Sequence, residues 1–228
     1  MSSYIIEGGK KLEGEVDVSG SKNAALPIIA ACILNGTTTT LYNVPDIQDI
    51  KITLQIIQLL GGKVIRKKGK MIIDSQNIKS KEIPDELMRK MRSSVILAGA
   101  ILGRFKEAVF SYPGGCDIGR RPIDLHLKGF EMLGTKINKE GGYIRCSCDR
   151  LIGNDIHLDF PSVGATENII LASVLAEGET TITNAAMEPE IVDLQELLNR
   201  MGAKVRGAGT NIIKVTGVKN LKSASYNI

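Results

Sequence analysis

With 228 residues, 43% of them hydrophobic, the chain is long enough to bury a substantial core, and its composition argues against disorder. The 29 basic and 25 acidic side chains leave a formal charge of +4, which suits anionic small molecules and falls well short of a nucleic-acid-binding footprint. Because Trp is absent and aromatic residues make up only 4%, the stacking surfaces of single-strand binders are missing too, and we expect no nucleic-acid partner.

The first twenty residues begin with MSSYIIEGGKKLEGEV, which lacks the basic stretch and following apolar stretch of a secretory signal. No later run has the length and hydrophobicity needed to span a bilayer. We therefore predict a cytoplasmic protein without a membrane partner. The segment 1–20 is predicted to be a strand that belongs outside the repeat that follows it.

A pattern then recurs three times between about residues 15 and 217. Its clearest marker is a glycine in LLGGKV, EMLGTKI and NRMGAKV, which places Gly61, Gly134 and Gly202 at equivalent positions. The residues before each glycine have the apolar spacing of an amphipathic helix, and the residues after it resemble strands. Each glycine is therefore predicted to end a helix in a left-handed conformation.

A second helix of different character precedes each amphipathic one, at 23–34, 93–103 and 164–176. These stretches are rich in alanine and aliphatic residues on nearly every face, which is typical of a buried helix. A β-rich segment such as GTTTTLYNV separates the two helices, and a hairpin such as KVIRKKGKMIID, turning within 66–70, follows the second one. The sequence predicts one α/β domain of three β-α-β-α-β-β units with the first helix of each unit inside.

The entrances to the three inner helices carry groups suited to anions. GSKNAAL places Lys22 and Asn23 at the first entrance, Arg92 precedes the second, and PSVGATEN places Ser162 and Gly164 at the third. Free backbone N–H groups, the helix dipole and a cation together can bind a doubly anionic ligand. The alternative for the first entrance is an ordinary helix cap with a solvated lysine.

The loop YPGGCDIGRRP makes the second unit longer than the other two. Glycines on one side of Cys116 and arginines on the other suit a mobile lid with a reactive thiolate, although a plain surface loop with an incidental cysteine fits as well. The cysteines of RCSC, at 146 and 148, lie on one face of a predicted strand and are expected in its core. With two histidines in the chain, we predict neither a metal site nor a cofactor.

Four motifs, GSKNAALP, PGGCDIGRRPIDLH, PSVGATEN and NAAMEPEIVDL, together closely resemble the UDP-N-acetylglucosamine 1-carboxyvinyltransferase (enolpyruvyl-UDP-GlcNAc synthase) family over essentially the whole chain. The resemblance implies an inside-out α/β barrel, with three β-α-β-α-β-β units in each of two domains. It also implies transfer of the enolpyruvyl group of phosphoenolpyruvate to the 3′-hydroxyl of UDP-N-acetylglucosamine with release of phosphate, the first committed step of peptidoglycan synthesis.

The same resemblance assigns roles to individual residues. Cys116 matches the family's proton donor, which can form an adduct with phosphoenolpyruvate and is the target of fosfomycin, and Lys22 with Asn23 matches the pair that binds phosphoenolpyruvate. Arg92 matches a substrate-contacting arginine. Two further segments match those that bind UDP-N-acetylglucosamine: Arg121, Pro122, Ile123, Asp124 and Leu125, and then Ser162, Val163 and Gly164.

Family members are nearly twice as long and have their active site between two domains. We therefore expect residues 1–20 to belong to an absent second domain, residues 21–228 to form the threefold domain that carries the cysteine loop, and the chain alone to be inactive. Two other functions remain open at this point. One is a noncatalytic module or scaffold that binds a UDP-sugar, and the other is the related 3-phosphoshikimate 1-carboxyvinyltransferase.

Overall fold

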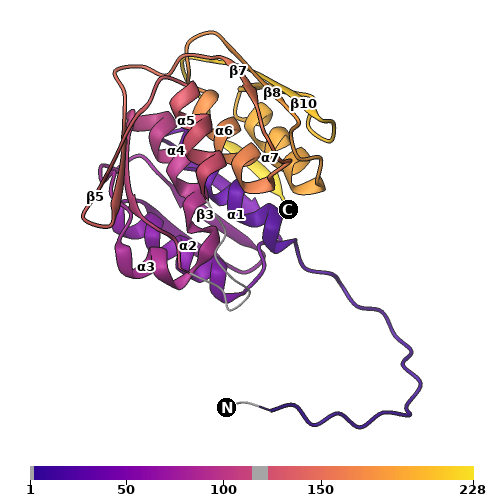
Figure 1. Ribbon diagram of the computed structural model, residues 1–228. Helices are drawn as coiled ribbons and strands as arrows, with labels where there is room; N and C mark the ends of the chain where they lie inside the picture. The colour runs from indigo at the N-terminus through magenta and orange to yellow at the C-terminus, as the bar shows by residue number, and fades with distance from the viewer. Residues whose placement is uncertain (1–2, 115–122) are drawn as a thin grey trace.

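Three apolar helices lie against one another at the centre of the molecule (Figure 1). They are α1 (Lys22–Ala31), α4 (Ile96–Phe105) and α6 (Val163–Ser173). Almost every residue of these helices is buried, because none of them has a polar face to turn toward water. The computed structural model describes residues 3–114 and 123–228. It confirms the three predicted inner helices.

All three inner helices have bounds that differ from the predicted ones, and α6 ends at Ser173 instead of residue 176. Helix α1 ends at Ala31 instead of residue 34, where it loosens into a turn before Gly36. Helix α4 begins only at Ile96, because a short 3₁₀ helix (Arg92–Val95) precedes it. There the hydroxyl of Ser94 donates to backbone carbonyls of the preceding turn, and such local bonds compete with a regular helix start.

The outer helices are amphipathic and cover the inner ones. They are α2 (Gln48–Leu59), α5 (Asp124–Met132) and α7 (Pro189–Arg200), and a short α3 (Asp85–Lys90) precedes the second unit. Each of the three long outer helices ends at the predicted glycine, with φ of 107° at Gly61, 90° at Gly134 and 96° at Gly202. At all three ends the glycine N–H and the next N–H donate back to the last turn, which is the Schellman arrangement.

Each unit contributes a three-stranded antiparallel sheet to the outside of the molecule. The sheets are β1 (Thr38–Tyr42) with β3 (Lys70–Asp74) and β2 (Lys63–Lys67); β4 (Glu107–Ser111) with β6 (Tyr143–Ser147) and β5 (Lys136–Glu140); and β8 (Glu179–Thr183) with β10 (Ile212–Thr216) and β9 (Lys204–Arg206). In each sheet the last two strands of the unit form the predicted hairpin. Sheets outside and helices inside confirm the inside-out α/β barrel.

A parallel neighbour completes every sheet, and its origin differs between units. In the third unit it is β7 (Asp155–His157), which runs beside β8, and in the second it is a single bridge from Glu82 to Val109. The first unit takes its parallel strand from the far end of the chain, where β11 (Ala224–Asn227) pairs with β1. The prediction of a repeat confined to about 15–217 was wrong in this respect, because the first unit is closed by residues beyond 217.

Residues 3–20 lie outside this closed arrangement and extend away from the rest of the molecule in Figure 1. They form no strand, since they make no backbone hydrogen bonds to any described strand. Their apolar side chains are fully open to solvent, with exposed fractions of 87–94% for Tyr4, Ile5, Ile6, Leu12, Val16 and Val18. That they form a strand in contact with another part of the protein stays a prediction. Within the described ranges, no helix is long and apolar enough to cross a membrane.

The closing strand β11 is anchored by Tyr226, which is 4% exposed and donates its hydroxyl hydrogen bond to carboxylates of α7, with 2.8 Å to Asp193 Oδ1. We predict that Tyr226→Ala lowers the free energy of unfolding by about 3–5 kcal/mol, as expected for removal of a buried aromatic ring. Urea denaturation measures this change. Tyr143→Ala is the control, because Tyr143 is 38% exposed, and an equal loss in both variants would contradict closure by β11.

Candidate active site

Lys22 and Asn23 occupy the first turn of α1, as predicted. The Ser21 hydroxyl caps the helix by accepting from the Ala24 N–H at 3.4 Å. Lys22 Nζ lies 3.2 Å from Asp49 Oδ2 at the start of α2, and the lysine side chain remains half exposed. The ordinary serine cap is therefore present, with a half-exposed lysine paired to Asp49, and an anion site at this entrance stays a prediction.

Contacts along α2 connect this entrance with the second one. One turn after Asp49, the Thr53 hydroxyl donates to the Asp49 carbonyl and lies 3.8 Å from Met91 Sδ. Met91 directly precedes Arg92, which opens the 3₁₀ helix before α4. The Lys22 and Arg92 segments are therefore linked by a chain of contacts through Asp49, Thr53 and Met91.

The chain just before the cysteine loop lies next to the same region. On the N-terminal side of the loop, the Gly114 N–H donates to the Met88 carbonyl at 3.1 Å, and a Cβ at Gly114 would collide with the Arg89 carbonyl. On the C-terminal side of the loop, the described chain resumes at Ile123, a buried residue at the N-cap position of α5. The predicted site residues Cys116, Arg121 and Pro122 lie outside the described residues.

The two segments predicted to bind UDP-N-acetylglucosamine form the N-termini of α5 and α6. Asp124 and Leu125 begin α5, and Ser162 caps α6 by accepting from the Ala165 N–H at 3.4 Å. Val163 and Gly164 follow as the first helical residues. Among the described residues, no acceptor takes the N–H groups of residues 163–164, so the N-terminus of α6 presents free donors.

A buried polar contact holds these two helix ends together. His126, in the first turn of α5, is 7% exposed, and its Nδ1 lies 2.7 Å from the amide nitrogen of Asn168 on α6. Its ring also covers Gly164, where a Cβ would lie 3.2 Å from His126 Cε1. Burial lowers the pKa of His126 to about 4 from its ordinary 6.5, so the imidazole is neutral at physiological pH. An exposed ion pair, Lys128 with Asp159 at 2.6 Å, joins the same two segments.

Glu167 introduces a buried carboxyl group one turn into α6. It is 6% exposed, and burial raises its pKa well above the usual 4.5. Repulsion from Glu190 and Glu188, at the start of α7, acts in the same direction. The acidic group is therefore held toward its protonated form one turn from the N-terminus of α6.

Four residues of this region escaped the sequence analysis: Asp49, His126, Glu167 and Asn168. A signal was available for the last three, because Glu167 and Asn168 interrupt an otherwise apolar buried helix and His126 is one of two histidines. Nothing in the sequence distinguished Asp49 from other surface acids. As predicted, Cys146 is a buried strand residue, with Ile144 and the half-buried Cys148 on the same face.

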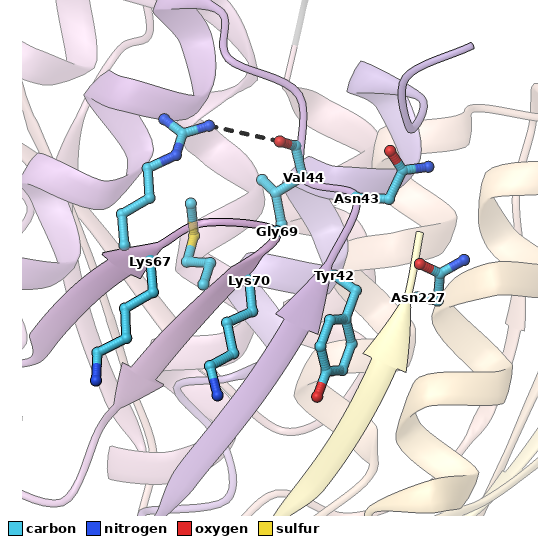
Figure 2. A pocket seen from close by; sticks show the side chains of 9 residues that line it. Tyr42, Asn43, Val44, Lys67, Gly69, Lys70 and Asn227 are labelled. Atoms are coloured by element: carbon cyan, nitrogen blue, oxygen red, sulfur yellow. Dashed lines mark hydrogen bonds between the residues drawn. The ribbon is translucent and has the colours of Figure 1, made fainter. Parts of the chain in front are cut away.

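A concave surface of about 600 Å³ lies at the ends of the first sheet, apart from the predicted site residues. Figure 2 shows the side chains of Lys67, Lys70 and Tyr42 projecting on the same side of neighbouring strands, in a cross-strand row that continues to Asn227. Arg66 at its edge is neutralised by Asp46 at 2.8 Å and also bonds the Val44 carbonyl. The described residues place no buried, unpartnered polar atom in this pocket, so we interpret it as a solvated basic patch.

The overall arrangement is shared with solved enolpyruvyl transferases. The crystal structure of the enolpyruvyl transferase NikO from Streptomyces tendae matches 97% of this chain, and 52% of that one, with a TM-score of 0.83 at 22% identity. EPSP synthase from Acinetobacter baumannii matches 97% of this chain and 51% of that one with a TM-score of 0.76 at 24% identity. The fold is thus that of an enolpyruvyl transferase domain.

The family model of EPSP synthase (3-phosphoshikimate 1-carboxyvinyltransferase) matches residues 6–228, and the chain belongs to this family. Within it, the chain is 54% identical to UDP-N-acetylglucosamine 1-carboxyvinyltransferase 2 of Caldanaerobacter subterraneus and 47% identical to the protein of that name in Bacillus subtilis. Both alignments cover the whole chain but only 55% and 53% of the relatives, so the chain spans about half their length. These names confirm the resemblance predicted from the four motifs.

We predict that Glu167→Gln is more stable than the native protein at neutral pH. A carboxyl group whose pKa is raised by folding stabilises the native state below its unfolded pKa of about 4.5, and this contribution is lost as the pH rises through the folded pKa. The stability advantage of the variant therefore grows from pH 4 to pH 8, as urea denaturation at each pH measures. The exposed Glu188→Gln is the matched control, with a smaller change, and a pH-independent difference for Glu167→Gln contradicts the assignment.

Proposed function

We propose that this chain forms the cysteine-loop half of a transferase that moves the enolpyruvyl group of phosphoenolpyruvate to the 3′-hydroxyl of UDP-N-acetylglucosamine. The observation that carries the proposal is the pair of helix N-termini at α5 and α6, held together by His126 and Asn168. The free N–H groups of α6 and the dipoles of both helices fit a diphosphate, which is the doubly charged centre of a nucleotide sugar. The names of relatives about 50% identical support the same substrate.

In this proposal the phosphoenolpyruvate binds at the first helix entrance. Lys22, half exposed and beside the free end of α1, supplies a cation for its phosphate or carboxylate, with Asn23 as a neighbouring hydrogen-bonding group. Asp49 holds the lysine in place through its 3.2 Å contact. Arg92 opens the neighbouring segment and serves as a substrate-contacting arginine.

The proposed reaction is an addition followed by an elimination. The sugar 3′-oxygen forms a bond to C2 of phosphoenolpyruvate and loses its proton to a base, while an acid protonates the C3 methylene. Loss of a proton from the resulting methyl group and of phosphate from C2 then regenerates the double bond in the product. We assign the C3 acid to Cys116 and contacts with the nucleotide sugar to Arg121, Pro122, Ile123, Asp124, Leu125, Ser162, Val163 and Gly164.

We further propose that the base and additional cations come from a second domain, and that residues 3–20 pack against it. The relatives' greater length and the six exposed apolar side chains of this segment support this division. The bare half is then inactive, and the reaction belongs in the cytoplasm. A shikimate substrate is disfavoured, because relatives about 50% identical over the whole chain carry the nucleotide-sugar name.

Lys22→Ala tests the proposal in the full-length native protein. We predict that it lowers kcat/KM for phosphate release from phosphoenolpyruvate and UDP-N-acetylglucosamine by about 100-fold or more, because a cation aimed at developing charge is lost. Lys51→Ala is the matched control, since Lys51 lies on α2 and, among the described residues, pairs with the exposed Asp46 alone. Normal turnover by Lys22→Ala would show that the lysine has no part in the mechanism. A native protein that accepts shikimate 3-phosphate but not UDP-N-acetylglucosamine would contradict the proposed substrate.

A further inference from the structure

The side chain of Asn168 joins α6 to the first turn of α4. Its Oδ1 accepts from the Gly99 N–H at 2.9 Å, and its Nδ2 donates to the Val95 carbonyl at 2.9 Å. Val95 and Gly99 are the residues whose carbonyl and N–H stand opposite each other across that turn. One fully buried amide therefore holds both backbone groups from outside the helix.

Gly99 is required for this contact. A Cβ at residue 99 would lie 2.4 Å from Asn168 Oδ1 and 2.5 Å from the Asn168 carbonyl oxygen, both closer than atoms can approach. Only glycine lets the backbone of α4 come near enough for the amide to reach it. Residues 99 and 168 are thus sterically matched across the interface between two inner helices.

These bonds fix the orientation of the amide and, through it, the tautomer of His126. A backbone N–H can only donate and a carbonyl can only accept, so the oxygen of Asn168 must face Gly99 and its nitrogen must face Val95. The second hydrogen of that nitrogen then points at His126 Nδ1, 2.7 Å away, which must accept it. The ring is consequently neutral and carries its proton on Nε2.

The contact lies where three proposed substrate segments meet. The 3₁₀ helix that opens with Arg92 ends at Val95, His126 directly follows the segment 123–125, and the ring of His126 lies over Gly164. Asn168 touches the first and second of these elements and belongs to the helix that carries the third. Removal of this amide therefore changes the packing of all three segments.

We propose that Asn168 and His126 are positioning residues for the nucleotide sugar. The amide holds the imidazole as the neutral Nε2–H tautomer, and the imidazole sets the spacing between the helix ends of α5 and α6 on which the diphosphate binds. This inference rests on the proposed function for its ligand, while the arrangement of the amide and the imidazole is independent of it.

Asn168→Ala separates this role from simple folding, because α4 keeps its own backbone hydrogen bond across the first turn when the amide is gone. In the full-length native protein, we expect ¹⁵N chemical shifts of the His126 ring to report a single Nε2–H tautomer at pH 7 without any ligand. In Asn168→Ala we expect a mixture of tautomers. We also expect the Kd for UDP-N-acetylglucosamine, measured by calorimetry, to rise at least tenfold.

Rescue by a conservative change completes the test. His126→Asn places an amide oxygen where Nδ1 accepts but lacks the ring atoms that lie over Gly164, so its Kd should fall between the native value and that of His126→Leu, which should resemble Asn168→Ala. Asn199→Ala is the matched control, since Asn199 also bonds a backbone carbonyl and N–H, both of Val205 and remote from the site, and its Kd should not change.

Two results overturn the inference: native-like affinity in Asn168→Ala, or a native His126 that samples both tautomers. A native protein that fails to bind UDP-N-acetylglucosamine contradicts the proposed function instead. The ring measurement needs no ligand, so the two failures are distinguishable.

Discussion

The close approach of α4 and α6 is the constraint on which the rest of the domain depends. Gly99 and Gly103 lie one turn apart on α4, and a Cβ at either would fall within 2.7 Å of a backbone oxygen of α6. Because both helices are apolar on all sides, their stability requires complete burial, and glycine lets them pack with backbone nearly touching backbone. The outer helices and sheets then cover what the inner helices leave open.

This packing also explains why the proposed substrate segments lie together. Because α4 and α6 run parallel, with Gly99 against Asn168 and Gly103 against Leu171, their N-termini lie near each other. The domain needs few charged side chains to attract an anion, because the backbone donors at these ends supply part of the charge. A net charge of only +4 is consistent with such a site.

The sequence predicted the features that repeat and missed those that occur once. Gly61, Gly134 and Gly202 recur with the same flanking pattern, so three helices and three hairpins could be predicted from local physics. The pairing of β11 with β1 joins residues nearly two hundred positions apart, and no local pattern encodes it. The Asn168 contact was missed for a related reason, since a polar residue in a buried helix signals a partner without naming it. Asp49 resembled any solvated acid until the fold placed it beside Lys22.

Hydrogen–deuterium exchange of the full-length native protein, with and without UDP-N-acetylglucosamine, tests the central claim most directly. If the N-termini of α5 and α6 hold the diphosphate, the ligand slows exchange of the N–H groups at residues 124–126 and 163–164, and shikimate 3-phosphate leaves them unchanged. Unchanged exchange at these N–H groups under saturating UDP-N-acetylglucosamine would contradict the account.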